Sequence, residues 1–459
     1  MIFPEHIFKA YDIRGLIEGE LSPEIAYRLG RAFVVFMKKN GFGLSGDKFV
    51  VGRDMRESSF GFSEEVMRGI EDEGGTVVDI GLVSTPVFNF ACAHFEDHTA
   101  GIMVTASHNP AEYNGFKMTM GDGLPIGGQT GMQEIKKMVQ VEDFGTVDKV
   151  REKGNRLKKE ILPVYIDHIF GLIKKENIKP MKIVVDGGNG MGGEILPHVL
   201  KVLPQIDVEY LYIEPDGNFP NHEANPLKIE TLKDLQAKVN ETNANFGFAM
   251  DGDADRIGLV DEKGQVVEAS FVGALMGLEV LKKHGRGRML YDLRSSMIIP
   301  EVWKENGGAP DMCMVGHANI KKMMKEKETI FASELSEHFY FGDLYDLESS
   351  DLCLLYILEM LSRENKSLSE LVQPLKKYFH SGEINFEVED KDEVIAQLDE
   401  KYKAEAEEIS HLDGLWMKFG WGWVSVRKSN TEPVLRLNLE VGSEEDMREK
   451  VEEISGLIK

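Results

Sequence analysis

An internal repeat constrains the fold of this chain more than any other feature. Three segments begin alike, with a basic residue, an apolar strand and then Asp or Arg in a loop: KFVVGRD at 48–54, KIVVDGGNG at 182–190 and RMLYDLRSS at 288–296. Downstream of each, a second apolar strand ends in polar residues, in GIMVTASHNP at 101–110, NFGFAMDGDADR at 245–256 and TIFASELSEH at 329–338. We interpret these segments as three divergent copies of one α/β domain.

The order of the patterns predicts the domains. Strand patterns alternate with longer helical patterns, which is typical of βαβ units, whereas the C-terminal end of the chain has an α+β pattern. We predict three similar α/β domains with mixed sheets, at 1–150, 151–256 and 257–370, and a smaller C-terminal α+β domain at 371–459. Ligands bind beyond the carboxyl ends of strands in open α/β sheets, so the polar strand ends are expected around one central cleft. The charged segment 150–160 is expected to be a linker or a solvated helix face.

Composition excludes several classes of function. A net charge of −25 argues against nucleic acid as a partner. The chain has no apolar run of about 18 residues and no signal-peptide pattern at its start, so we expect no membrane partner. Cys92, Cys313 and Cys353 show neither a disulfide framework nor metal-ligand spacing, which favours a reducing cytoplasm.

Three alternating carboxylates, Asp251, Asp253 and Asp255, follow directly after an apolar strand. Carboxylates this close repel one another unless a cation joins them, and hard oxygen ligands suit Mg²⁺ or Ca²⁺. The pattern lacks the Gly and Glu positions of an EF-hand loop. The alternative is a solvated acidic turn.

Ser107 stands at the end of another apolar strand, where functional loops are usually found. The G-x-S-x-G elbow of hydrolases is absent. His108 is adjacent in sequence, so we expect its ring to point away from Ser107 and to be a poor base for it. A serine that carries a phosphoryl group fits better, because nearby Mg²⁺ would neutralise its charge. A helix N-cap serine is equally compatible with the spacing.

Two further loops carry polar side chains suited to binding. In VRKSNTEP at 426–433, cations stand beside short polar donors, which is the chemistry of a phosphate cradle. In SELSEH at 333–338, Glu334, Ser336 and His338 alternate and would share one side of an extended segment, as suits recognition of sugar hydroxyls. A polar hairpin loop is the alternative for the first.

One motif points to a different function. GNGMGG places Gly188, Gly190 and Gly193 in G-x-G-x-x-G spacing after a strand, with Glu214 after the next strand-like run. This pattern matches a dinucleotide-binding fingerprint and makes a dehydrogenase the rival hypothesis. It leaves the aspartates at 251–255 without a role.

In combination, the loops resemble the α-D-phosphohexomutase superfamily, especially its phosphomannomutase/phosphoglucomutase branch. The resemblance covers nearly the whole chain, and its motifs are FKAYDIRG, VGRDMRESS, TASHNP, NGFK, FPNHEANP, DGDADR, ELSEH and SNTEP, in that order. TASHNP and DGDADR are very specific as a pair. Two departures lie in the sugar loop, where Ser333 and Glu337 replace the usual glycines.

The resemblance implies a role for each site residue. Ser107 would be the phosphoserine carrier, and its phosphate with Asp251, Asp253 and Asp255 would bind Mg²⁺. The catalytic candidates are Arg14, Ser107, His108, Lys117, Arg256 and His317. The substrate-binding candidates are Tyr11, Glu334, Ser336 and His338 for the sugar side, and Arg427, Ser429, Asn430 and Thr431 for the non-transferred phosphate.

The implied activity is that of an isomerase which interconverts hexose 1-phosphate and hexose 6-phosphate, of mannose or glucose or both. It would use Mg²⁺, with hexose 1,6-bisphosphate as intermediate and activator, in a cytoplasmic monomer or homodimer. The alternatives are a phosphoglucosamine mutase, made less favourable by Leu335 where those enzymes usually have Gln, and a non-catalytic protein that binds sugar phosphate or a dinucleotide.

Overall fold

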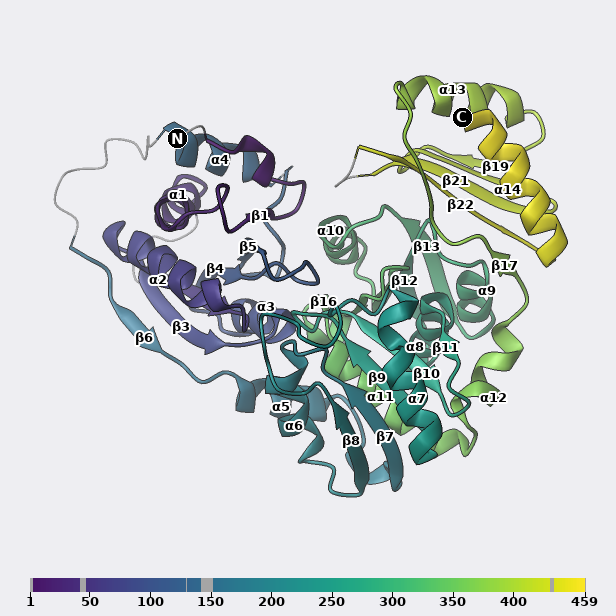
Figure 1. The fold of residues 1–459 in the computed structure, drawn as a ribbon, viewed down its shortest axis with the longest axis horizontal. Coiled ribbons are helices and arrows are strands. Elements are labelled where there is room, and N and C mark those ends of the chain that lie inside the picture. Colours follow the sequence, from purple (N-terminus) through teal and green to yellow (C-terminus); the bar gives the residue numbers. More distant parts are fainter. Residues whose placement is uncertain (1–2, 42–46, 129, 142–151, 430–432, 459) are drawn as a thin grey trace. The chain divides into compact units, whose positions relative to one another are not determined.

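The computed structural model describes residues 3–41, 47–128, 130–141, 152–429 and 433–458 (Figure 1). The chain divides into two compact units. Unit 1 comprises Met1–Val267 and Glu337–Leu368, and unit 2 comprises Glu268–Ser336 and Ser369–Lys459.

The first sheet of unit 1 has the strand order β1-β5-β4-β2-β3-β6. Its strands are β1 (Ile13–Leu16), β2 (Lys48–Arg53), β3 (Thr76–Leu82), β4 (His98–Val104), β5 (Tyr113–Met120) and β6 (Arg156–Lys158). β2 lies between β3 and β4 and is parallel to both, whereas β5 is antiparallel to β4 and β1. The polar ends of β2 and β4 therefore meet at one edge of the sheet, as the repeat predicts.

The helices of this domain are α1 (Pro23–Lys39), α2 (Glu57–Asp72), α3 (Thr85–His94) and α4 (Met132–Val141). α1 and α2 lie side by side (Figure 1) and approach closely because glycines line their contact. A Cβ atom on Gly30 would lie 2.2 Å from the Val66 carbonyl oxygen, and one on Gly69 would lie 2.2 Å from that of Tyr27.

Strand β6 corrects the expectation for the charged segment 150–160. Its described part is neither a linker alone nor a helix face, because Arg156–Lys158 pairs in parallel with β3. Arg156 also donates to Glu64 and Glu71 of α2. Pairing at a sheet edge leaves the side chains in solvent, so a charged segment forms a strand there without apolar periodicity. The first sheet thus extends beyond the predicted domain boundary at 150.

The second sheet of unit 1 has the order β11-β10-β9-β7-β8. Its strands are β7 (Met181–Asp186), β8 (Ile206–Leu211), β9 (Phe246–Met250), β10 (Ile257–Asp261) and β11 (Val266–Val267), with helices α5 (Leu162–Gly171), α6 (Gly192–Leu200) and α7 (Lys233–Thr242). β10 pairs antiparallel with β9, so this sheet continues past the predicted boundary at 256. Unit 1 also contains the hairpin β15 (Phe339–Phe341) and β16 (Leu347–Glu348), and helix α11 (Ser350–Glu364).

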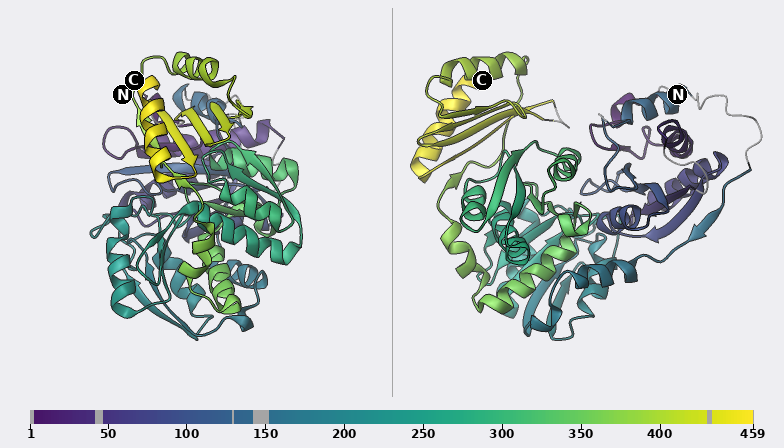
Figure 2. Two further views of the ribbon diagram at one scale, coloured as in Figure 1. Left: turned by 90° about the vertical axis from the view of Figure 1, so that its right-hand side faces the viewer. Right: turned by 180° about the vertical axis from the view of Figure 1, so that it is seen from behind.

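Unit 2 contains a parallel three-strand core in which β12 (Gly287–Asp292) lies between β13 (Gly308–Cys313) and β14 (Phe331–Ser333). Its helices are α8 (Ala269–His284), α9 (Ile298–Glu305) and α10 (His317–Lys327). The C-terminal sheet contains β17 (Phe379–His380), β18 (Ile384–Phe386), β19 (Glu408–Ser410), β20 (Leu415–Phe419), β21 (Gly422–Lys428) and β22 (Leu435–Val441). Every pairing in it is antiparallel. Two helices, α13 (Lys391–Tyr402) and α14 (Glu444–Ile458), cover one face of this sheet (Figure 2).

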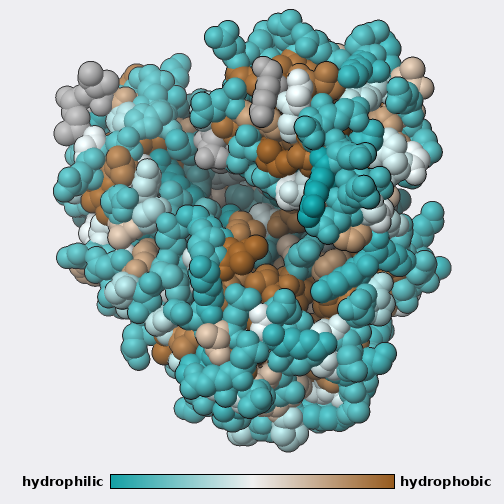
Figure 3. Space-filling model, turned by 45° about the vertical axis from the view of Figure 1, so that its right-hand side comes forward, coloured by the Kyte–Doolittle hydropathy of each residue, from teal (hydrophilic) through white to brown (hydrophobic). Residues whose placement is uncertain are grey.

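These sheets confirm the predicted fold class of three α/β domains and a C-terminal α+β domain. Hydrophilic residues dominate the face of the molecule in Figure 3. Within the described ranges, none of the helices is both long and apolar enough to span a bilayer.

Candidate active site

Ser107 lies in the turn that joins β4 to β5, and it is 2% exposed. Its φ of 52° is in the left-handed region, which costs a non-glycine residue about 1–3 kcal/mol. The backbone N–H of Ser107 donates to Thr105 Oγ1 over 2.9 Å. Because the turn leads into a strand, the alternative of a helix N-cap serine is wrong.

His108 does not point away from Ser107, contrary to expectation. Its Nδ1 atom lies 3.1 Å from Ser107 Oγ. The left-handed backbone at Ser107 explains this, because it brings two adjacent side chains to the same side. Burial, followed by the positive charges of Arg256 and Arg14, lowers the pKa of His108 well below 6.5. The imidazole is therefore neutral at neutral pH.

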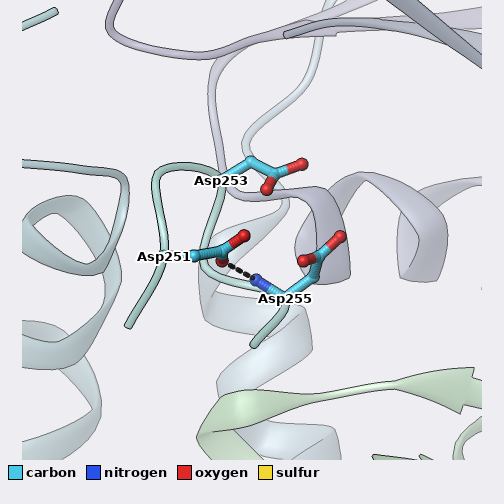
Figure 4. A group of neighbouring side chains, drawn as sticks. All are labelled: Asp251, Asp253 and Asp255. Carbon is cyan, nitrogen blue, oxygen red and sulfur yellow. Dashed lines mark hydrogen bonds between the residues drawn. The ribbon is translucent and has the colours of Figure 1, made fainter. Parts of the chain in front are cut away.

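The three aspartates gather at the carboxyl end of β9 and face one another (Figure 4). One oxygen from each lies within 4.8 Å of the others. Asp251 and Asp253 are completely buried and Asp255 is 4% exposed, so the alternative of a solvated acidic turn is wrong. Asp251 Oδ1 accepts from the N–H of Asp255 over 3.0 Å, while its Oδ2 accepts from Ser107 Oγ over 3.1 Å. The predicted serine and the predicted metal loop therefore meet.

Lys117, on β5, extends into this group of carboxylates. Its Nζ donates to Asp253 Oδ2 over 2.6 Å and to Asp255 Oδ2 over 2.8 Å. Thr85 at the start of α3 also donates to Asp253 Oδ2, over 2.6 Å. The other oxygen of Asp253, Oδ1, is buried and has no hydrogen-bond partner among the described residues. Three converging carboxylates, one with a free buried oxygen, fit a hard divalent cation.

The carboxylates differ in electrostatic environment. Burial and the charges of Asp255 and Asp253 raise the pKa of Asp251 well above 3.8. Burial acts in the same direction on Asp255, but Lys117 and His338 outweigh it and hold the pKa of Asp255 well below 3.8. Burial alone would lower the pKa of Lys117, yet Asp253 and Asp255 raise it above 10.5. Lys117 is therefore an ammonium ion in this arrangement.

Further predicted cations surround the Ser107 turn. Arg14 on β1 donates from Nη1 to Asn109 Oδ1 over 2.6 Å. Arg256 lies with its Nε 3.3 Å from Nε2 of His338 and 3.9 Å from Asp251 Oδ2. His338 Nε2 is also 3.2 Å from Asp255 Oδ1. Tyr11 lies in the bend before β1. Unit 1 thus brings Arg14 close to the Ser107 turn, and Arg256 and His338 close to the aspartates.

The remaining sugar-loop candidates belong to unit 2. Glu334, 3% exposed, accepts from the N–H of Gly316 over 3.1 Å, which places it beside His317 at the start of α10. Arg294 Nη2 lies 3.5 Å from Glu334 Oε1 and 2.7 Å from Asp292 Oδ2. Ser336 is half-buried in the same loop.

Arg427, at the end of β21, is 1% exposed. Its Nη1 donates to the Lys428 carbonyl over 3.1 Å and lies 3.8 Å from Asp413 Oδ2. Its Nε is buried without a hydrogen-bond partner in the described part of the chain. Burial, followed by the charge of Arg294, lowers the pKa of Arg427. Ser429 follows this strand, while Asn430 and Thr431 lie outside the described residues.

The glycine motif at 188–193 packs against the aspartate loop at 251–255. A Cβ atom on Gly190 would lie 2.9 Å from the Gly252 carbonyl oxygen and 3.0 Å from that of Asp251. The N–H of Met191 donates to the Gly252 carbonyl over 2.9 Å. Small residues are needed here because two backbones touch, which is a different reason from the approach of a dinucleotide.

Sequence reasoning missed three buried polar residues, two in unit 1 and one in unit 2. Thr85 follows β3, and Arg56 and Arg294 follow the first strand of their repeats. Arg56 and Arg294 lie two residues after an aspartate, in RDMR and YDLR, and each donates from Nε to that aspartate. The shared Asp-x-Arg spacing after the strand is the signal that points to them.

Four family models match the chain from end to end. They are phosphoglucomutase/phosphomannomutase alpha/beta/alpha domains I, II and III, at residues 5–146, 163–264 and 269–378, and the C-terminal domain at 383–457. The chain belongs to the phosphoglucomutase/phosphomannomutase family. The predicted resemblance is thereby confirmed.

Individual proteins of this family are similar over the full length. The chain is 38% identical to the phosphomannomutase of Vibrio cholerae, with 98% of each chain covered. It is 39% identical to the phosphomannomutase of Methanocaldococcus jannaschii, with 98% of this chain and 97% of the relative covered. A solved phosphoglucomutase/phosphomannomutase family protein from Burkholderia thailandensis has a TM-score of 0.91 and 32% identity, with 100% and 98% covered.

Proposed function

We propose that this protein is a phosphohexomutase that interconverts hexose 1-phosphate and hexose 6-phosphate, with mannose and glucose as candidate sugars. The observation that carries the proposal is Ser107, whose Oγ lies 3.1 Å from the buried carboxylate of Asp251. Family membership adds support, because full-length relatives are named phosphomannomutase.

Ser107 is the proposed phosphoryl carrier. In the first transfer, the bond between phosphorus and Ser107 Oγ breaks and a bond to the free sugar hydroxyl oxygen forms. The hydroxyl proton is released to a base, and the product is a hexose 1,6-bisphosphate. In the second transfer, the bond between the other phosphorus and its sugar oxygen breaks and a bond to Ser107 Oγ forms. The sugar oxygen takes up a proton, which leaves the product hexose monophosphate and phosphorylated Ser107. A turn that is almost fully buried suits this chemistry, because exclusion of water prevents hydrolysis of the phosphoserine.

His108 and Lys117 are the proposed proton-handling groups. We assign to His108 the exchange of a proton with Ser107 Oγ, and the 3.1 Å distance between its Nδ1 and that oxygen supports the assignment. The protonated Lys117 ammonium pairs with both Asp253 and Asp255 and adds positive charge near the transferring group. Arg14 and Arg256 add two more cations on either side, which favours the charge that develops on the phosphoryl oxygens.

The proposed metal ligands are Asp251, Asp253 and Asp255. A phosphate on Ser107 beside three carboxylates would meet strong repulsion, and their oxygens converge as a Mg²⁺ site requires. When bound, such a cation supplies electrostatic stabilisation of negative charge on the phosphoryl oxygens.

In unit 2, the proposed roles are recognition of the sugar and of the non-transferred phosphate. We assign Glu334 and Ser336, which share one loop, to hydrogen bonds with sugar hydroxyls, and we assign His338, in unit 1, the same role. Arg427 contributes a buried Nε donor, and Arg294 lies close enough to add charge. Ser429 is proposed to belong to this phosphate site, and Asn430 and Thr431, which lie outside the described residues, keep the role that the family resemblance implies.

A coupled assay tests the proposal. Mannose 1-phosphate, glucose 1-phosphate and glucosamine 1-phosphate are offered separately, with Mg²⁺ and a catalytic amount of hexose 1,6-bisphosphate. We expect turnover of mannose 1-phosphate, glucose 1-phosphate or both, and none by the Ser107→Ala variant. Binding of hexose phosphate without turnover would instead identify a non-catalytic binding protein, and turnover of glucosamine 1-phosphate alone would favour the phosphoglucosamine alternative.

A further inference from the structure

One side chain holds most of the Ser107 turn. Arg56 follows β2 and is 2% exposed. Its Nη2 donates to the Ser107 carbonyl over 2.9 Å and to the Asn109 carbonyl over 2.5 Å. Its Nη1 donates to the carbonyls of Pro110, over 2.7 Å, and Tyr113, over 3.0 Å. Four carbonyl groups of a single turn therefore converge on one guanidinium.

Asp54 fixes the direction of that guanidinium. Arg56 Nε donates to Asp54 Oδ2 over 3.2 Å, and the N–H of Arg56 donates to Asp54 Oδ1 over 3.1 Å. Ser59 Oγ also donates to Asp54 Oδ1. Asp54 is completely buried. The carboxylate offsets the cost of burying a cation and, by its contacts, leaves both Nη atoms facing the turn.

Two glycines and a phenylalanine complete the enclosure. The ring centroid of Phe219 lies 5.1 Å from Arg56 Cζ. A Cβ atom on Gly217 would lie 2.6 Å from Arg56 Cα. On the other side of the turn, a Cβ atom on Gly252 would lie 2.4 Å from the Ser107 carbonyl oxygen. The Ser107 carbonyl is thus held between the metal loop and the guanidinium.

We propose that Arg56 is a positioning residue, which holds the Ser107 turn in its left-handed conformation and so aims Ser107 Oγ at Asp251 and His108. The inference rests on the proposed function of Ser107 as phosphoryl carrier. Arginine suits this task because its planar guanidinium offers five N–H donors in fixed directions, whereas a lysine offers three at one point. The favourable carbonyl contacts compensate for the strained φ of Ser107, which is 52°.

A positioning role differs from a merely structural one in what a variant loses. Displacement of an attacking atom by about 1 Å can lower a rate by about a hundredfold. Loss of Arg56 should therefore lower kcat and the single-turnover rate of Ser107 phosphorylation. It should leave KM for hexose 1-phosphate nearly unchanged, because the contacts of Arg56 with described residues all belong to the enzyme itself: backbone carbonyls, Asp54 and the ring of Phe219.

The test uses the full chain with Mg²⁺ and hexose 1,6-bisphosphate. Variants are Arg56→Lys, Arg56→Ala and Asp54→Asn, with Arg68→Met as a matched arginine control on the exposed side of α2, where the side chain is 50% exposed. Steady-state kinetics give kcat and KM, and intact mass after rapid quenching gives the rate of Ser107 phosphorylation. Methylguanidinium is added to Arg56→Ala, with tetramethylammonium at equal concentration as the control salt.

We expect Arg56→Lys to lower kcat about tenfold to a hundredfold with KM within about twofold of wild type. Asp54→Asn should lower kcat in the same way, Arg68→Met should not, and methylguanidinium alone should restore part of the activity of Arg56→Ala. Wild-type kcat in Arg56→Lys and in Asp54→Asn would overturn the inference while leaving the proposed function standing. Absence of turnover in the wild type would overturn the proposed function itself. If Arg56→Ala does not fold, Arg56→Lys and Asp54→Asn decide the question.

Discussion

Glu337 provides a sharp test of how burial and backbone strain act in this chain. It is 7% exposed and has a φ of 68°. Its Oε2 has no hydrogen-bond partner among the described residues. Burial raises the pKa of Glu337 from 4.5 to about 8, although Arg256 and His338 act in the opposite direction.

The sign of the pH dependence follows from this raised pKa. Between about pH 4.5 and pH 8, the folded chain holds a proton on Glu337 that the unfolded chain has released. The free energy of unfolding therefore decreases as pH rises through this window, and it levels off above it. At about 1.36 kcal/mol per pKa unit, the loss from this one group is roughly 3–5 kcal/mol.

Two variants separate the charge from the strain. Glu337→Gln keeps the size and the left-handed backbone but cannot ionise. Its free energy of unfolding should therefore increase relative to that of the wild type by roughly 3–5 kcal/mol as pH rises from about 5 to about 9. Glu337→Gly also removes the strain of the positive φ, which should raise the free energy of unfolding by about 1–2 kcal/mol at any pH. The glycine makes the unfolded chain more flexible, which should lower that gain by about 0.4–1 kcal/mol.

Urea denaturation at about pH 5, 7 and 9, followed by far-UV circular dichroism, measures these differences. All four tryptophans, Trp303, Trp416, Trp421 and Trp423, lie in unit 2, so their fluorescence reports unit 2 separately in the same samples. If the stabilities of wild type and Glu337→Gln run parallel across this pH range, the buried, protonated carboxyl is refuted.

Four other outcomes are expected. Ser107→Ala should abolish mutase turnover with an unchanged circular dichroism spectrum, and intact mass of the wild type after labelled bisphosphosugar should show one added phosphate; wild-type turnover by the variant would exclude the phosphoserine. Asp253→Asn, or EDTA on the wild type, should lower kcat far more than substrate affinity in steady-state kinetics, and full activity in chelator would refute the metal. Arg427→Ala should raise KM for every hexose phosphate alike, by about tenfold to a hundredfold, because a lost charge-assisted bond costs about 1.5–3 kcal/mol. Glu334→Gln should instead change the ratio of kcat/KM between mannose and glucose phosphates. The reverse pattern would show that the two loops are wrongly assigned. Calorimetry should detect no binding of NAD, and NAD binding without mutase activity would restore the dehydrogenase hypothesis.

Sequence reasoning anticipated the contact between Ser107 and Asp251. Ser107 follows β4 of the first sheet and Asp251 follows β9 of the second, and ligands bind beyond the carboxyl ends of strands in such sheets. The left-handed backbone at Ser107 was not predictable from the sequence, because it depends on Arg56, a residue far away in the chain. The direction of the His108 ring follows from that backbone and was therefore wrong in the sequence prediction. Strand β6 was also missed, because an edge strand with solvated side chains has no periodicity to detect.

The Asp-x-Arg spacing illustrates a different limit. The residue types were visible in both copies of the repeat, but a sequence does not say that one guanidinium contacts a turn that begins 51 positions later, as Arg56 does with Ser107. The family resemblance implied roles for the catalytic, metal-binding and substrate-binding candidates, and it implied none for Arg56 and Arg294.

The close approach of Gly190 to the metal loop changes how a mutational scan of this protein should be interpreted. A side chain at position 190 would strike the carbonyls of Asp251 and Gly252, so substitutions there should behave like lesions of the aspartates themselves. A scan that scores only growth or turnover would mark the glycine loop as catalytic, although it contributes no reacting group. Measured metal affinity would separate the two causes, because a displaced ligand weakens binding while a missing proton donor does not.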